Sequence, residues 1–399
     1  MAEFFESRKL RYEILKLCDK RWQIAEVVGD GREQRGGRFA RSEFEEVERG
    51  VLAKANALLA GEVQAVKVLR ERVRDDGFVT TTEVFFREAT GGKAETPATV
   101  SRYDGPVSVC TGPGDLYRRD ACKAIGVLLR SYLDKQFITA LELVHFHPYI
   151  RKLNDSYSLI QGAVHQVASA QARNGDVKER GRALHGLIEA VESKAREAMA
   201  EKRLPAIEGG DVKRFCERLA PRYEGDQLRF YAMLGIARHF QGTQSFQARL
   251  DFALDLLPSE LPAQIKALLD EIAAGCLDSS QLIMDLLGHR PNLAAALVAL
   301  AQLARGREEA GNTGTLAKLR ALIAGGMLPL AADSLWDRIL RELARGRPLS
   351  RSDDKQEWNL LMRTSDLLLP DCPEDRKHAM ADHFKGRLRR LRDAAVLRE

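Results

Sequence analysis

Signature motifs of catalysis are missing from this chain of 399 residues. It has no Walker loop of the form G-x-x-x-x-G-K-S/T, no G-x-G-x-x-G, no G-x-S-x-G elbow and no H-E-x-x-H pair of zinc ligands. Its six cysteines never form C-x-x-C, a spacing that excludes a zinc ribbon and is not typical of a disulfide framework. We therefore expect free thiols in a reducing compartment and no cofactor, and the missing motifs favour a non-catalytic role over an enzyme.

Long apolar runs are missing as well. The longest, at residues 293–304, is far shorter than the roughly 20 residues that a membrane span needs. The opening residues, MAEFFESRKL, are charged and lack the apolar stretch of a secretory signal. A hydrophobic fraction of 45% with 30% charged residues is typical of a folded globular protein. We expect a cytoplasmic protein without a membrane span, and a net charge of +5 does not by itself predict nucleic acid binding.

Alternating apolar residues dominate the first hundred positions. Residues 11–28 alternate with a period of two and are interrupted at Asp19-Lys20, which predicts two strands joined by a tight turn. We expect Trp22 to be buried and to pair with the strand that contains Tyr12 and Ile14.

A helix and a second hairpin complete this module. Ser42 is a suitable N-cap for a helix over 43–59. Two further β-rich runs flank Asp75-Asp76-Gly77, a hairpin signal. The order ββαββ predicts a small α+β domain over 1–95, with an antiparallel sheet backed by one helix and able to fold alone.

From residue 107 the periodicity becomes helical, after a polar linker at 96–106. We expect a helical domain over 107–375, which is either globular or an irregular α-solenoid, because no fixed repeat of about 34 or about 40 residues is present. Asp115 is the expected N-cap of a helix that continues to Pro148, with a break near Asp134. Glycines and prolines delimit the other predicted helices, at 157–173, 177–203, 211–220, 225–240, 244–257, 261–275, 279–288, 292–305, 315–325, 330–345, 353–368 and 373–396.

Two histidines in the stretch VHFHPYI are weak candidates for a metal site. His145 and His147 at i, i+2 on a helix point about 200° apart, whereas helical zinc pairs need i, i+4 spacing. Pro148 disfavours helical geometry at the residue before it. We expect this stretch to end a helix rather than bind a metal.

The stretch CTGPGDLYRR, residues 110–119, resembles a phosphate-binding turn. Glycines precede a helix start, and Arg118 and Arg119 follow, which makes the two arginines a candidate anion site. Asp115 opposes this interpretation, because its carboxylate would lie where the anion should bind.

The basic excess lies at the C-terminus. Residues 376–399 hold eight Lys or Arg against three Asp or Glu, a net of +5 that equals the charge of the whole chain. Met380, Phe384, Leu388, Leu391 and Ala395 form an apolar stripe that a helix would pack against the protein. The candidate partner-binding residues on this basic amphipathic helix are Lys385, Arg389, Arg390 and Arg392.

These observations favour a cytosolic regulatory or scaffold protein that acts through protein-protein binding. One alternative is an enzyme with a site assembled around Cys110–Cys122 and His145/His147. A second alternative is a nucleic-acid-binding regulator that uses the basic C-terminal helix. The sequence does not identify the partner, the pathway or the oligomeric state.

Overall fold

The structure is a computed structural model of the whole chain. It describes residues 7–18, 21–28, 50–58, 65–74, 79–88, 98–172, 175–201, 204–307, 314–350 and 354–396. The chain divides into two compact units, each with its own core. The first comprises Met1–Thr99 with Lys135–Phe137 and Phe240–Ala248, and the second comprises Val100–Asp134, Ile138–His239 and Arg249–Glu399.

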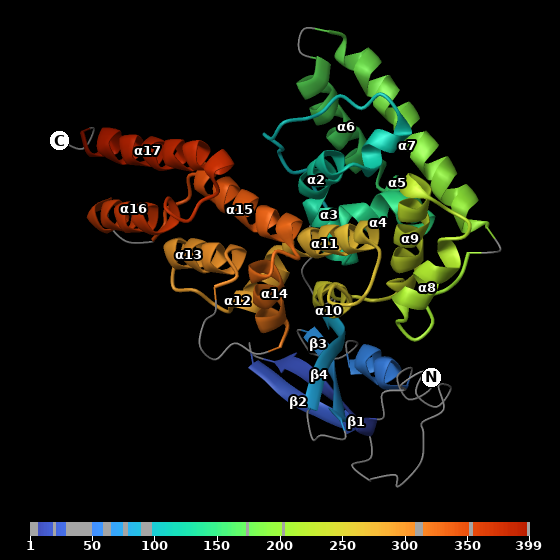
Figure 1. Ribbon diagram of the computed structural model, residues 1–399. Coiled ribbons are helices and arrows are strands. Elements are labelled where there is room, and N and C mark those ends of the chain that lie inside the picture. The colour runs from blue at the N-terminus through green and yellow to red at the C-terminus, as the bar shows by residue number, and fades with distance from the viewer. Residues whose placement is uncertain are drawn as a thin grey trace. The chain divides into compact units, whose positions relative to one another are not determined.

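An antiparallel sheet of four strands forms the first unit, as the sequence predicts (Figure 1). The strands run in the order β2-β1-β3-β4. In the first hairpin Leu17 lies opposite Trp22, and in the central pair Ile14 lies opposite Val68. The strand bounds are β1 Ser7–Cys18, β2 Arg21–Val28, β3 Ala65–Arg74 and β4 Val79–Glu88.

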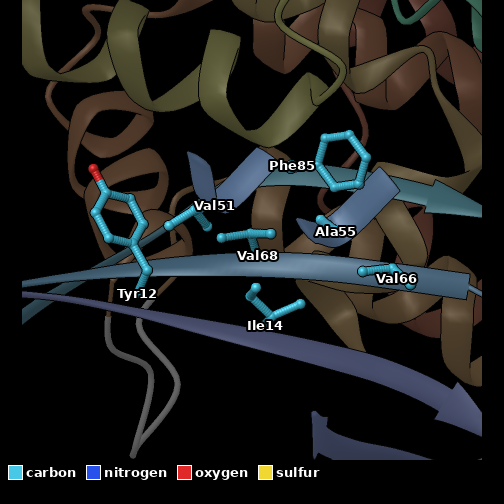
Figure 2. Packing of buried hydrophobic residues seen from close by; sticks show 7 residues of the cluster. All are labelled: Tyr12, Ile14, Val51, Ala55, Val66, Val68 and Phe85. Carbon is cyan, nitrogen blue, oxygen red and sulfur yellow. The ribbon is translucent and has the colours of Figure 1, made fainter. Parts of the chain in front are cut away.

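One face of this sheet is covered by a helix, of which the structure describes residues 50–58. Figure 2 shows the helical side chains of Val51 and Ala55 packed over the strands. Alternate residues of β1, Tyr12 and Ile14, are fully buried, as the period of two requires. The core of this unit consists of Tyr12, Ile14, Val51, Ala55, Val66, Val68 and Phe85.

The first strand begins earlier than its apolar pattern indicates. Residues 7–10 read Ser-Arg-Lys-Leu, which carries little alternation, yet their backbone pairs with the end of β3. The pairing of Trp22 with β1 agrees with the prediction, whereas its side chain lies outside the described residues. Ser42 and the two predicted turns, at 19–20 and at 75–77, also lie outside them.

The second unit is mainly helical, also as predicted. Most of its helices begin and end within two residues of the expected positions. The bounds are α2 Arg119–Leu128, α3 Arg130–Gln136, α4 Ala140–His145, α5 His147–Asn154, α6 Tyr157–Ala172, α7 Val177–Met199, α8 Val212–Leu219, α9 Gly225–His239, α10 Phe246–Leu256, α11 Ala263–Leu277, α12 Ser280–Leu287, α13 Leu293–Ala304, α14 Thr315–Ala324, α15 Pro329–Ala344, α16 Asp354–Leu368 and α17 Glu374–Val396.

Short polar side chains set several of these starts. Each accepts a hydrogen bond from a free backbone N–H in the first turn of its helix, which is the usual role of an N-cap residue. The caps of this kind are Asp176, Asp211, Ser279 and Asn292.

The region from 115 to 148 departs from the prediction of one helix with a single break. A short 3-10 helix, η1 (Pro113–Tyr117), comes first, and α2 begins only at Arg119 with Arg118 as its N-cap. Asp115 therefore does not cap a long helix. A break follows α3, close to the predicted one near Asp134: Phe137 has a positive φ of 53° and Thr139 caps α4. A further break, between α2 and α3 at Leu129, was not predicted. The apolar spacing is nearly continuous across these breaks, so periodicity alone does not reveal them.

Candidate functional site

The C-terminal helix α17 packs against the helical unit along one side. Its side chains Met380 and Phe384 are buried, as the apolar stripe predicts. Leu388 and Leu391 are partly buried, and the side chain of Ala395 lies outside the described residues. Figure 1 shows α17 in red beside α16 and next to α15, and both helices contact it.

Arg387 fixes the middle of α17, and the sequence reading missed it. Its guanidinium is buried and donates two hydrogen bonds to carbonyls in the last turn of α15, from Nε to Leu343 O at 2.8 Å and from Nη2 to Glu342 O at 3.0 Å. A third, from Nη1 to Arg347 O at 2.6 Å, reaches the turn that follows α15. A helix C-terminus leaves its last carbonyls unpaired and carries partial negative charge. Arg387 therefore neutralises the end of α15 and attaches α17 to it.

A charge network fixes the start of α17. Arg376 lies 3.1 Å from Asp333 and 3.3 Å from Asp337, two carboxylates on α15. Arg119 of α2 also pairs with Asp333, at 3.2 Å, and Lys123 pairs with Asp337. Two of the basic residues in the C-terminal segment, Arg376 and Arg387, thus serve to attach the helix.

Three other basic residues face away from the packed side. Lys385, Arg389 and Arg392 are exposed and follow one another at i, i+4 and i+7, a spacing that places them on one helix face. Lys385 lies 3.8 Å from Asp382, and Arg392 lies 3.0 Å from Asp393, both exposed pairs of small energetic value. We call Lys385, Arg389 and Arg392 the basic row.

Arg390, the fourth predicted residue, does not belong to the basic row. It lies on another flank of α17, where its Nε donates to Gly386 O at 3.3 Å. A Cβ at Gly346 would meet its guanidinium, so Arg390 lies close to the turn that follows α15. Its exposure leaves its charge accessible to solvent.

Large apolar side chains are exposed on the neighbouring helix. Trp358 and Met362 of α16 are 42% and 43% exposed and lie one helical turn apart. Leu367 is 57% exposed on another flank of α16. The side of α16 with Leu361, Thr364 and Leu368 is buried. The hairpin α16–α17 therefore presents both exposed apolar groups and exposed positive charge.

The predicted anion site is occupied by the protein's own carboxylate. Asp115 Oδ2 accepts hydrogen bonds from the backbone N–H groups of Thr111 and Gly112, at 2.8 and 3.0 Å, and from the Thr111 hydroxyl. These hydrogen bonds, those from Gly112 and Thr111 first, lower the pKa of Asp115. Arg118 lies 3.2 Å from Asp115, while Arg119 pairs with Asp333. The two arginines are thus paired with different carboxylates, which favours a structural role for this turn.

A helix ends at His145, as predicted, but Pro148 does not keep His147 out of helical geometry. His145 is the last residue of α4, and His147 begins α5 with Pro148 in its first turn. The His145 ring is buried with Nδ1 2.8 Å from Leu141 O, and burial lowers its pKa to about 3. His147 instead lies 3.7 Å from Glu192. Over the described ranges, no group of three or more His, Cys, Asp or Glu has the arrangement of a metal site.

The segment 110–122 and helix α4 do come together, but Cys110 is buried and Cys122 is half-buried. Burial raises the pKa of Cys110 and raises that of Cys122 to about 12, so both remain protonated near neutral pH. The Cys122 thiol lies 3.6 Å from Leu116 O, and the Cys110 thiol lies 3.8 Å from Ser108 O. A nucleophilic cysteine needs a lowered pKa, which neither environment provides.

A buried ion pair at the centre of the helical unit was also missed. Glu142 and Arg249 are both fully buried, with Glu142 Oε1 2.9 Å from Arg249 Nε. Glu142 Oε2 accepts from the N–H and the hydroxyl of Thr139, at 2.8 and 2.9 Å, in a capping box. The T-x-x-E spacing is a readable signal for the cap. Nothing in the sequence marks Arg249, 107 residues later, as the partner.

Among the described residues, no single helix is long and apolar enough to span a membrane. Helices α14 and α15, bent by 104° at their junction, reach that length and apolar composition only when they are taken together. Comparisons of the chain with protein families, with curated proteins and with solved structures gave no match. The function therefore rests on the residues described above.

Proposed function

We propose that the protein is a cytoplasmic, non-catalytic regulatory or scaffold protein that binds an acidic segment of a partner protein through the hairpin α16–α17. The observation that carries this proposal is the basic row, Lys385, Arg389 and Arg392, on the outward face of a helix that is attached from its other side. A helix fixed in this way presents its charges with little further loss of conformational entropy on binding.

Separate sets of residues attach α17 and carry its exposed charge. Arg376 and Arg387 are engaged with α15, by ion pairs and by carbonyl contacts. Among the described residues, the ion pairs of the basic row are the weak exposed ones with Asp382 and Asp393. Its charge is therefore available to a partner, and its substitution leaves the packed side of the helix intact.

The exposed apolar residues of α16 define the partner further. Tryptophan is the residue type most enriched among those that dominate binding energy, and methionine adapts to varied surfaces. Trp358 and Met362 can supply such contacts, while the basic row supplies long-range attraction and orientation. A partner segment that is helical and amphipathic, with one acidic and one aliphatic face, fits both features.

The test measures binding of a fluorescent synthetic peptide with a glutamate face and a leucine face to the full-length protein. We expect saturable binding that weakens as salt rises from about 50 to about 300 mM. The triple substitution Lys385→Glu, Arg389→Glu and Arg392→Glu should weaken it about tenfold or more, a change of about 1.4 kcal/mol or more. The melting temperature of this triple variant should stay near that of the unaltered protein.

A matched control variant reverses the charge of three exposed basic residues elsewhere in the helical unit, by substitution with glutamate. Arg151, Lys152 and Arg182 are exposed and belong to α5 and α7. Their reversal changes the net charge equally and should leave peptide binding unchanged.

Three outcomes would refute the proposal. The first is an absence of peptide binding at low salt. The second is equal weakening by both triple substitutions, which would indicate a nonspecific effect of net charge. The third is a double-stranded DNA probe that binds more tightly than the peptide and loses affinity on reversal of the basic row, which would favour a nucleic-acid-binding regulator.

A further inference from the structure

The helical unit contains an apolar cavity of about 140 Å³ that the function proposed above does not use. Its walls come from α2, α4, α5, α6 and α7 and from the segment 100–112, which we call the strap. Aliphatic side chains make up most of the lining, among them Ala121, Ile125, Leu143, Val164, Leu184 and Val191. Two segments singled out in the sequence, 110–122 and the end of α4, meet at this cavity.

We propose that this cavity is a binding site for a small neutral hydrocarbon group, such as a six-membered ring or a short aliphatic chain. Protein interiors are packed about as densely as organic crystals, so a void of this size leaves its lining without many dispersion contacts. An engineered cavity of about 150 Å³ lined by similar residues stays dry and takes up benzene or xenon. The volume and the lining therefore match an apolar ligand of that size.

The two amide side chains of the lining, Gln171 and Asn154, are engaged with the protein, which disfavours a strongly polar ligand. Gln171 donates from Nε2 to Ser108 O at 2.5 Å and accepts at Oε1 from Arg180 Nε at 2.6 Å. Asn154 donates to Glu192 Oε2 at 3.0 Å. Asp120, the one acidic residue in the lining, is exposed to solvent.

No Lys or Arg belongs to the lining, so a ligand carboxylate would have no cation inside the cavity. The nearby Arg180 guanidinium already donates to Gln171 and, through Nη2, to Cys110 O at 2.6 Å. Transfer of a charged group into an apolar site is costly without a partner. The ligand is therefore neutral.

The strap forms one wall of the cavity, which is partly open to solvent. It has no regular secondary structure and is held by hydrogen bonds rather than by a sheet or helix. Ser101 N donates to Leu128 O at 2.9 Å, Gln166 Nε2 donates to Ser101 O at 3.2 Å, and Arg180 reaches the carbonyl of Cys110. Each such hydrogen bond contributes only modestly to net stability, so local movement of the strap can widen the entry for a small ligand.

The experiment titrates the full-length protein, with labelled methyl groups, against benzene and records methyl NMR spectra. We expect saturable shifts confined to methyl groups of the cavity. Ala163→Leu, which fills the cavity from α6, should weaken benzene binding at least about tenfold. Ala183→Leu is the control, since Ala183 is exposed on the neighbouring helix α7 and should leave binding unchanged.

Ala121→Leu on α2 fills the cavity from another wall and keeps the test valid if Ala163→Leu does not fold. Circular dichroism checks that each variant is folded. Benzoate and benzylammonium serve as charged analogues and should bind at least about tenfold more weakly than benzene. Absence of saturable shifts would show that the cavity is only a packing gap and would overturn the proposal. Binding that survives both filling variants, or tighter binding of either charged analogue, would overturn it as well.

Discussion

Substitution of Arg387 by methionine should weaken the attachment of α17 to α15 without changing the exposed charge of the helix. Methionine keeps much of the aliphatic volume of the arginine side chain, so packing changes little. The three carbonyl oxygens, two in the last turn of α15 and one in the turn that follows it, then lose their donor. This substitution therefore isolates the hydrogen-bonding role of the guanidinium.

The expected loss follows from the burial of these contacts. The bond to Leu343 O is buried, whereas those to Glu342 O and Arg347 O are partly buried and can be replaced by water. A buried polar group left unpaired costs about 1–3 kcal/mol, and partly exposed groups cost less. The sum is a loss of about 2–4 kcal/mol, large against the whole stability of a typical domain, about 5–15 kcal/mol.

Arg389→Met is the matched control, two residues along the same helix and exposed. Exposed substitutions of this kind change stability by less than about 0.5 kcal/mol. Urea unfolding, followed by circular dichroism of the helical signal, compares the two variants with the unaltered protein. If Arg387→Met unfolds at the same urea concentration as Arg389→Met, then α17 is not attached to α15, and the reasoning that separates the attached arginines from the basic row fails.

Three further predictions concern the two units. Gly235→Ala should lower stability by about 1–3 kcal/mol, because a Cβ there would lie 2.2 Å from the Phe215 ring. Gly186→Ala has open space around it and should raise stability by about 0.5–1 kcal/mol. Thermal or urea unfolding measures both changes. In the folded protein the pKa of His145 is about 3, whereas in the unfolded chain it lies near 6.5. The unfolded state therefore binds more protons between these values, and stability should fall as pH decreases from about 6.5 to about 3. His145→Phe should reduce this dependence on pH, as measured by urea unfolding at several pH values. A fragment of residues 1–95 should give the circular dichroism and dispersed amide spectrum of a folded α+β domain, and an unfolded fragment would show that its core needs further segments of the chain.

Much of the fold could be predicted from the sequence, because apolar periodicity and helix caps depend on residues that are close together in the chain. The period of two in β1 is visible because alternate residues, Tyr12 and Ile14, face the core. Helix positions from 157 onward were predicted within a few residues, since cap residues such as Asp211 and Asn292 stand where helices begin. The breaks after η1 and at Leu129 were missed, because apolar spacing continues through them.

The candidate functional site could be predicted only in part from the sequence. Lys385, Arg389 and Arg392 were found because a local charge excess marks an exposed face. Arg387 has the same residue type and lies between them, yet it is buried against α15, and only tertiary contacts distinguish it. The apolar cavity was missed for the same reason, since its lining is assembled from five helices and the strap.

The central claim is that the basic row contacts a partner protein in the cell. A photo-cross-linking amino acid placed at position 385 of the full-length protein, activated in the cells that produce it, tests this most directly. We predict a discrete cross-linked protein with a segment rich in Asp and Glu, lost when Arg389 and Arg392 are changed to Glu and absent when the cross-linker stands at position 152. Cross-linking to nucleic acid, an absence of any cross-linked species, or a yield that the two substitutions leave unchanged would contradict the claim.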